Sequence, residues 1–181
     1  PAGSTGTDLA ASISPGLLRV SVAMEVDGEL KDLHLPLTDG AAVKLITWST
    51  PEGLHVMRHS SAHVLAQAVV ELFPDAKPTI GPVVEEGFYY DFHKEEPFTP
   101  EDLKEIETRA KQIIKRKIPL ARREVPSKEA LEIFKDNRFK CEIIESVDQD
   151  EVGEESEVSY YEQGDFKDLC RGPHIQHTGQ I

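Results

Sequence analysis

The stretch 54-LHVMRHSSAHVLAQAVVELF-73 decides the fold, because it predicts one long helix around which the other elements can be arranged. Its apolar side chains, among them Val56, Val64 and Val69, recur at spacings of three and four residues. Pro74 follows the last of them and predicts the end of the helix. Apolar residues surround much of the helix, which indicates a central helix with sheet around it.

The residues before this helix predict a small sheet. A short helix is expected at 7–13, and residues 17–35 alternate partly between apolar and polar side chains around Asp27-Gly28, a strong two-residue turn signal. Residues 42–48 predict a third strand, with Trp48 in the core at the junction. Three short strands need a packing partner. Pro51 and Gly53 mark the boundary to the long helix.

The residues after the helix predict alternating strands and helices. Residues 79–93 are β-like with glycine breaks, and 100–117 form a helix that Thr99 caps. We expect a short helix from a Ser127 cap to about Asp136, and a solvated acidic loop and strand edge over 142–157. The remaining expected strands are 120–125, 138–145, 157–164 and 165–170.

Composition excludes several classes of function. The chain has 181 residues and a formal net charge of −13, so any contact with nucleic acid must be local. The absence of a long apolar run predicts no membrane span and no membrane partner. The sequence has two cysteines, too few for a disulfide framework, and this predicts a reduced, cytoplasmic protein.

Two four-residue spacings carry the candidate chemistry. His59 and His63 would lie on one face of the long helix. Cys170 and His174 flank Gly172-Pro173, which cannot be helical and predicts a tight loop. If the loop meets the helix, the cluster suits either tetrahedral zinc or activation of a water by unmetallated imidazoles. Each motif alone is also common as ordinary structure.

Four sequence words, HSSAHVLAQA, IGPVVEEGFYYDF, RFKCEII and DLCRGPH, follow one another in this order. They resemble the editing domain of bacterial-type threonyl-tRNA synthetases, and residues 17–48 are similar to the small β-grasp (TGS) domain that precedes it in that family. The related alanyl-tRNA synthetase editing domain has a glycine-rich CGGTH-type loop where this chain has Arg171-Gly172-Pro173. The loop therefore favours the threonyl type.

The resemblance implies an α+β fold in two parts. Residues 1–50 would be a truncated β-grasp domain without its first hairpin, and residues 51–181 an editing domain whose long central helix packs in an antiparallel sheet. The aminoacylation and anticodon-binding domains would be absent, so this chain is expected neither to activate nor to transfer an amino acid. Its partners would be the remainder of the synthetase and the acceptor end of tRNA(Thr) carrying serine.

The implied reaction is hydrolysis of serine from tRNA(Thr), with water as the nucleophile and without metal or cofactor. A methyl group gives only about 1–3 kcal/mol of discrimination, so a second site that excludes threonine by its size is needed. We expect His59 to orient or deprotonate the water and Lys140 to hold a water or stabilise the oxyanion. The expected catalytic residues are His59, His63, Lys140, Cys170 and His174. The expected substrate-binding residues are Tyr90, Asp168, Gly81, Pro82 and Arg171.

Local RNA binding is expected on the helix at 100–117 and just beyond it. Residues 104–123 hold eight basic and two acidic side chains, which would suit the phosphates of an acceptor stem. The candidates are Lys111, Lys115, Arg116 and Lys117. Two alternatives stay open: a zinc-dependent trans-editing hydrolase of the alanyl type, and a non-catalytic tRNA-binding module.

Overall fold

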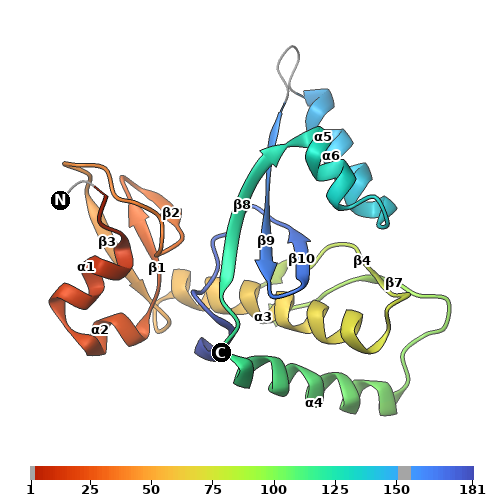
Figure 1. The fold of residues 1–181 in the computed structure, drawn as a ribbon. Helices are drawn as coiled ribbons and strands as arrows, with labels where there is room; N and C mark the ends of the chain where they lie inside the picture. Colours follow the sequence, from red (N-terminus) through yellow and green to blue (C-terminus); the bar gives the residue numbers. More distant parts are fainter. Residues whose placement is uncertain (1–2, 151–155) are drawn as a thin grey trace.

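A long helix, α3 (Pro51–Leu72), runs through the centre of the molecule (Figure 1). The computed structural model describes residues 3–150 and 156–181. The predicted helix is confirmed, and it begins at Pro51 because the Thr50 side chain accepts a hydrogen bond from the Gly53 N–H. Its buried side chains include the polar residues Ser60, His63 and Gln67 as well as valines and alanines. Polar groups at these central positions need partners from neighbouring elements.

The N-terminal part is a three-stranded antiparallel sheet with two short helices. The order is α1 (Gly6–Ile13), α2 (Pro15–Val20), β1 (Ser21–Val26), β2 (Glu29–Lys31) and β3 (Val43–Thr47), and the sheet order is β2-β1-β3. The expected hairpin and third strand are present. Residues 17–20 are helical, however, and not part of the first strand, because Ser14 caps a short helix that has Pro15 at its first position. Trp48 was expected in the core but is 54% exposed.

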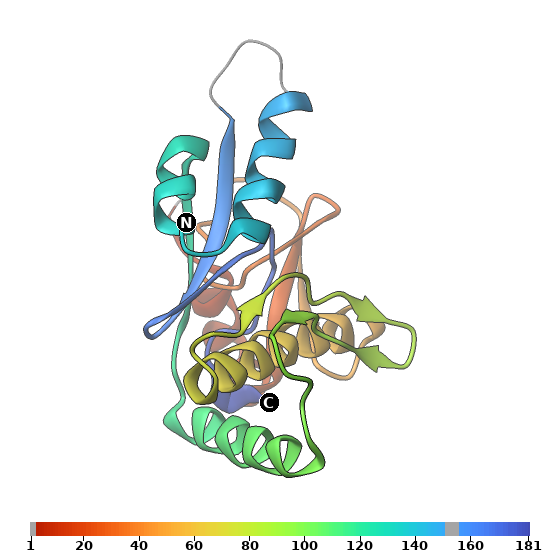
Figure 2. The same ribbon diagram turned by 90° about the vertical axis from the view of Figure 1, so that its right-hand side faces the viewer.

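The second part surrounds α3 with short hairpins, a helix and a second sheet. Four short strands follow α3: β4 (Lys77–Pro78), β5 (Val83–Val84), β6 (Gly87–Phe88) and β7 (Phe92–His93). Helix α4 (Pro100–Arg116) begins with the expected cap at Thr99. The antiparallel sheet β10-β9-β8 is formed by β8 (Leu120–Pro126), β9 (Glu157–Gln163) and β10 (Phe166–Leu169). Figure 2 shows α4 on the opposite side of α3 from this sheet.

Two helices, α5 (Ser127–Ile133) and α6 (Arg138–Asp150), connect β8 to β9. The prediction of a strand at 138–145 was wrong, because these residues belong to α6. Asn137 accepts a hydrogen bond from the Phe139 N–H, and Ile144 packs with Phe134 and Tyr160, so tertiary contacts favour a helix. Most of the expected acidic loop is therefore helical, and its residues 151–155 lie outside the described part. Ser127 is the first residue of α5 and caps nothing with its side chain.

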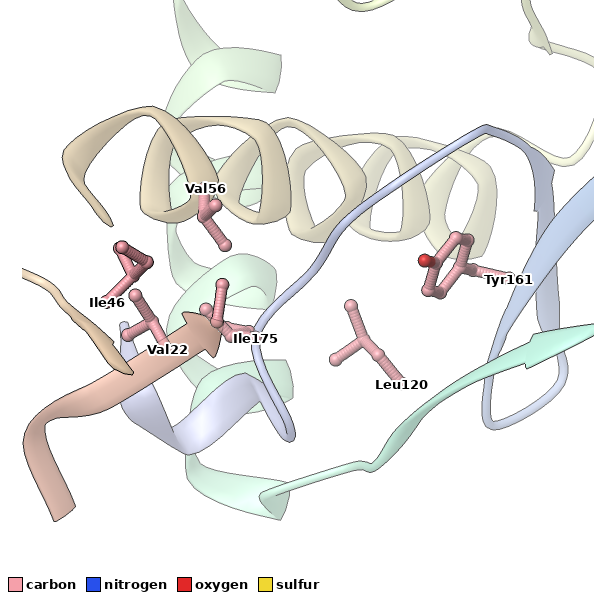
Figure 3. Close-up of a cluster of buried hydrophobic side chains, with 7 residues drawn as sticks. Val22, Ile46, Val56, Leu120, Tyr161 and Ile175 are labelled. Carbon is pink, nitrogen blue, oxygen red and sulfur yellow. The ribbon is translucent and has the colours of Figure 1, made fainter. Parts of the chain in front are cut away.

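One apolar cluster joins the two parts. Val22 and Ile46 of the N-terminal sheet meet Val56 of α3, together with Leu120, Tyr161 and Ile175 (Figure 3). The chain ends in a 3₁₀ turn, η1 (Thr178–Gln180). The result is an α+β fold with a shared core at the junction. Among the described residues, no helix combines the length and apolar character that a membrane crossing requires.

Candidate active site

The helix α3 and the loop after β10 bring the two predicted pairs together. The Cys170 Sγ lies 3.2 Å from His59 Nε2 and 3.2 Å from His174 Nε2. The rings of His63 and His174 are 4.1 Å apart, centroid to centroid. One ligand atom from each of these four residues can be chosen so that all lie within 4.8 Å of one another. The donor set of three imidazoles and a thiol fits tetrahedral zinc. Cys170 also hydrogen-bonds to His59 and to His174.

Ser60 fixes the orientation of His174, and sequence reasoning missed it. The Ser60 hydroxyl donates to the Val56 carbonyl at 2.8 Å and accepts from the Ile175 N–H at 3.1 Å. Its one hydrogen is therefore used, so His174 Nδ1, 3.0 Å away, must be the donor of the bond between them. This assigns the tautomer: Nε2 of His174 carries a lone pair directed at Cys170. The only signal in the sequence was the position of Ser60 between two histidines.

The loop that carries Cys170 and His174 depends on Gly172. This glycine has a φ of 75° and precedes a cis bond to Pro173. A Cβ at Gly172 would lie 2.0 Å from the hydroxyl oxygen of Tyr161, so a side chain cannot fit. The Gly172 N–H donates to Cys170 Sγ at 3.3 Å. The glycine therefore allows both the turn and the close cover by Tyr161.

Burial keeps the cluster electrically neutral. It lowers the pKa of His59 to about 4, with a smaller contribution from the neighbouring His63. Burial also lowers the pKa of His63, and it lowers that of His174 well below its usual value. For Cys170, burial raises the pKa to about 12. At neutral pH the imidazoles are thus uncharged proton acceptors, and the thiol is protonated and poorly suited to act as a nucleophile.

A second polar group lies beside the imidazoles. Lys140 Nζ is 2.6 Å from an Asp168 carboxylate oxygen, and both side chains are nearly inaccessible. The Tyr90 hydroxyl donates to the other Asp168 oxygen at 2.5 Å, and His63 Nε2 lies 3.6 Å from that oxygen. Lys140 also donates to the Thr79 carbonyl at 2.7 Å. Lys140 reaches this place from α6, although a strand was expected there.

These residues border a cavity of about 600 Å³ between α3, α6 and the sheet. The predicted residues that line it are His59, His63, Gly81, Pro82, Tyr90, Lys140, Asp168, Cys170 and Arg171. A Cβ on Gly81 would lie 2.3 Å from the Tyr90 ring, so this glycine lets the ring lie against the wall. His174 is not in the lining, because it is buried behind Cys170 and His59.

The predicted RNA-binding residues lie on α4 or at its end, away from the cavity. None of Lys111, Lys115, Arg116 and Lys117 lines it. Arg116 pairs with Glu71 of α3 at 2.7 Å, and Lys111 pairs with Glu107 at 2.5 Å. The positive charge expected on residues 104–123 is thus partly neutralised. The sequence did not predict the pairing with Glu71, because Glu71 lies outside that stretch. The arginines in the cavity wall are Arg122 and Arg171.

Comparisons with known proteins give the relatives of this chain. The family model "Threonyl and Alanyl tRNA synthetase second additional domain" matches residues 158–181, which include the loop of Cys170 and His174. A threonine–tRNA ligase of Geobacter sp. (strain M21) is 49% identical over 183 residues, covering 100% of this chain and 28% of the ligase. The chain is homologous to one segment of the threonine–tRNA ligases.

Other threonine–tRNA ligases show the same coverage. That of Desulfosudis oleivorans is 52% identical over 177 residues, which are 98% of this chain and 27% of the ligase. That of Oceanobacillus iheyensis is 48% identical and covers 100% of this chain and 28% of the ligase. The chain thus spans little more than a quarter of the length of these threonine–tRNA ligases. The cavity, the His59–His63 pair and the Cys170–His174 pair all lie within the segment that aligns with the ligases.

Proposed function

We propose that this chain is the editing part of a threonyl-tRNA synthetase and hydrolyses serine from mischarged tRNA(Thr). The observation that carries the proposal is the 600 Å³ cavity, which neutral imidazoles and a buried Lys140–Asp168 pair border. In this proposal residues 51–181 form the editing domain and residues 1–50 a truncated β-grasp domain. Its partners are the rest of the synthetase and the acceptor end of tRNA(Thr), in the cytoplasm.

The walls of the cavity support a test of side-chain size. Tyr90 is held by Asp168 on its hydroxyl and contacts Gly81 with its ring. Gly81 and Pro82 belong to the same wall. Serine differs from threonine by one methyl, and a rigid wall excludes a methyl more effectively than a yielding one. In this proposal Tyr90, Gly81 and Pro82 form the barrier against threonine, and Arg171, which also lines the cavity, contacts the terminal nucleotide when the tRNA is bound.

Hydrolysis needs a positioned water and a stabilised oxyanion. His59 is only partly buried and lines the cavity, and its neutral imidazole orients the water and accepts its proton. The water oxygen attacks the ester carbon, and the developing oxyanion lies near the Lys140 ammonium. The ester C–O bond then breaks, and the proton passes to the departing ribose oxygen. The products are serine and tRNA with a free terminal hydroxyl.

The other residues position this chemistry. Asp168 neutralises Lys140 and fixes Tyr90, while its charge also faces His63. Cys170, with its thiol protonated, lines the cavity, and His174 supports it from behind through the contact between His174 Nε2 and Cys170 Sγ. No step uses a metal. If zinc is bound, the three imidazoles and Cys170 would hold it, and it would act as a Lewis acid.

The test is deacylation of tRNA(Thr) charged with serine or with threonine. The chain should release serine well above the spontaneous rate and spare threonine. His59→Ala should lower the rate by about 10²–10⁴-fold. His55→Ala is the matched control, because His55 lies one helical turn earlier and is exposed; it should keep the rate. Serine release at the spontaneous rate would leave the non-catalytic RNA-binding module as the better description.

The zinc-dependent hydrolase of the alanyl type is a second candidate, and the close set of four ligands favours it. The loop Arg171-Gly172-Pro173 is of the threonyl type and argues against it. Metal analysis of the purified chain separates the two. Stoichiometric zinc, together with loss of serine release when the zinc is removed, would favour the zinc-dependent hydrolase over the metal-free mechanism.

A further inference from the structure

Asp32, which follows β2 in the N-terminal part, reaches into the candidate active site. Its side chain is 1% exposed. One carboxylate oxygen accepts the backbone N–H of His174 at 2.8 Å, and the other accepts the Tyr161 hydroxyl at 2.5 Å. Both partners belong to the second part of the chain. Figure 3 shows Tyr161 at the end of the apolar cluster that joins the two parts.

The two partners of Asp32 hold one short loop from two sides. The bond to His174 fixes the backbone where the loop ends. Tyr161 covers the loop, because its hydroxyl oxygen lies where a side chain of Gly172 would be. Its ring is also 4.4 Å from the His174 ring. A single carboxylate thus sets the position of both the Tyr161 side chain over the loop and the backbone at His174.

Adhesion between the two parts does not explain a buried carboxylate here. Val22, Ile46, Val56 and Ile175 already form an apolar contact across the junction. Burying a charge is costly, and apolar side chains of similar size often stabilise a protein as well or better. The value of Asp32 therefore lies in the direction of its two hydrogen bonds, which an apolar side chain would not reproduce.

We propose that Asp32 is a positioning residue, through which the N-terminal part holds the loop of residues 172–174 so that Cys170 and His174 face His59. Its effect on catalysis rests on the proposed hydrolytic function. Its effect on the loop does not, and can be measured without tRNA. The loop geometry of the candidate site is thus completed by a side chain from outside residues 51–181.

The first experiment measures alkylation of the two cysteines by iodoacetamide at one fixed pH, with peptide mass spectrometry of each. Cys170 reports the loop, and Cys141 on α6 is the internal control. Asp32→Ala should raise the Cys170 rate roughly tenfold, since a hydrogen bond to a charged group is lost. The Cys141 rate should stay the same. Asp39→Ala, an exposed acid in the same part, should change neither rate.

Two conservative variants keep the test decisive if Asp32→Ala does not fold. Asp32→Asn keeps an oxygen for the His174 N–H, and its Cys170 rate should rise only about threefold. Tyr161→Phe removes only the hydroxyl and should act in the same direction. An unchanged Cys170 rate in both variants, or equal increases at Cys170 and Cys141, would overturn the proposal.

The second experiment measures serine release by Asp32→Asn. Misplacement of the loop should lower kcat about threefold and leave KM within about twofold, because substrate contacts remain. A higher KM with unchanged kcat would contradict a positioning role. If the unaltered chain releases no serine, the proposed function fails, and the cysteine rates still decide whether Asp32 holds the loop.

Discussion

Replacing Lys140 by methionine should destabilise the protein strongly. The substitution removes the ammonium 2.6 Å from Asp168, whose side chain is 2% exposed. Asp168 would keep the hydrogen bond from the Tyr90 hydroxyl, and His63 Nε2 would still lie 3.6 Å away. Its carboxylate would, however, lose the positive charge of Lys140. The Thr79 carbonyl would lose its donor as well. Breaking a buried pair on one side costs about 3–5 kcal/mol, a large part of the usual 5–15 kcal/mol of unfolding free energy.

Urea unfolding at pH 7, followed by circular dichroism, measures this effect. Asp168→Asn should cost about 3 kcal/mol, because it leaves the lysine without its counter-charge. The double variant Lys140→Met/Asp168→Asn removes both charges. Its loss of unfolding free energy should therefore be smaller than the sum of the two single losses by at least about 2 kcal/mol. Lys104→Met, at an exposed position on α4, is the control and should stay within about 0.5 kcal/mol.

A loss below about 1 kcal/mol for Lys140→Met, or additive losses in the double variant, would refute this reasoning. The double variant also separates stability from chemistry. If Lys140 stabilises the oxyanion, the double variant should regain stability and still release serine slowly. Recovery of both would assign the lysine a purely structural role.

Three further predictions concern the loop, the imidazoles and the RNA. Gly172→Ala should cost about 2–4 kcal/mol in urea unfolding, from a positive φ and a contact with Tyr161; a neutral result would contradict the loop geometry. Because the pKa of His59 is lowered to about 4, the unfolded chain binds its proton first as pH falls from 6.5. The contribution of His59 to stability, up to about 3 kcal/mol, should therefore be lost between pH 6.5 and 4, and the drop over this range should be smaller in His59→Gln; equal pH profiles would contradict this. Lys115→Gln should lower the salt dependence of RNA binding by about one unit of slope, more than Arg116→Gln, whose charge Glu71 neutralises; the opposite order would exclude this face of α4.

The sequence predicted those elements whose signals are local. The periodicity and Pro74 sufficed for α3, Asp27-Gly28 for the hairpin and Thr99 for α4. The helix α6 was missed because Phe139, Cys141 and Ile143 alternate as in a strand. Its helical character depends on packing against α5 and β9, which no local pattern contains.

The same distinction holds in the candidate site. Helical spacing placed His59 and His63 together, and the kinked CxxxH loop suggested their partners. Lys140, Tyr90 and Asp168 were expected only from the resemblance to a family, since a lone residue in a strand or helix has no pattern. Asp32 and Ser60 gave no usable signal. Their roles come from hydrogen bonds across more than 100 positions of sequence.

The apolar cluster at the junction has a consequence for the modularity of this segment. The sequence divides into two parts at about residue 51. Val22 and Ile46 of the first part, however, share a buried core with Val56 and Ile175 of the second. A gene fusion that carried only the second part would expose the apolar end of α3 and release the loop of residues 172–174. Recombination at this boundary would therefore disrupt both the shared apolar core and the loop of the candidate site. We expect the two parts to be transferable between proteins only together.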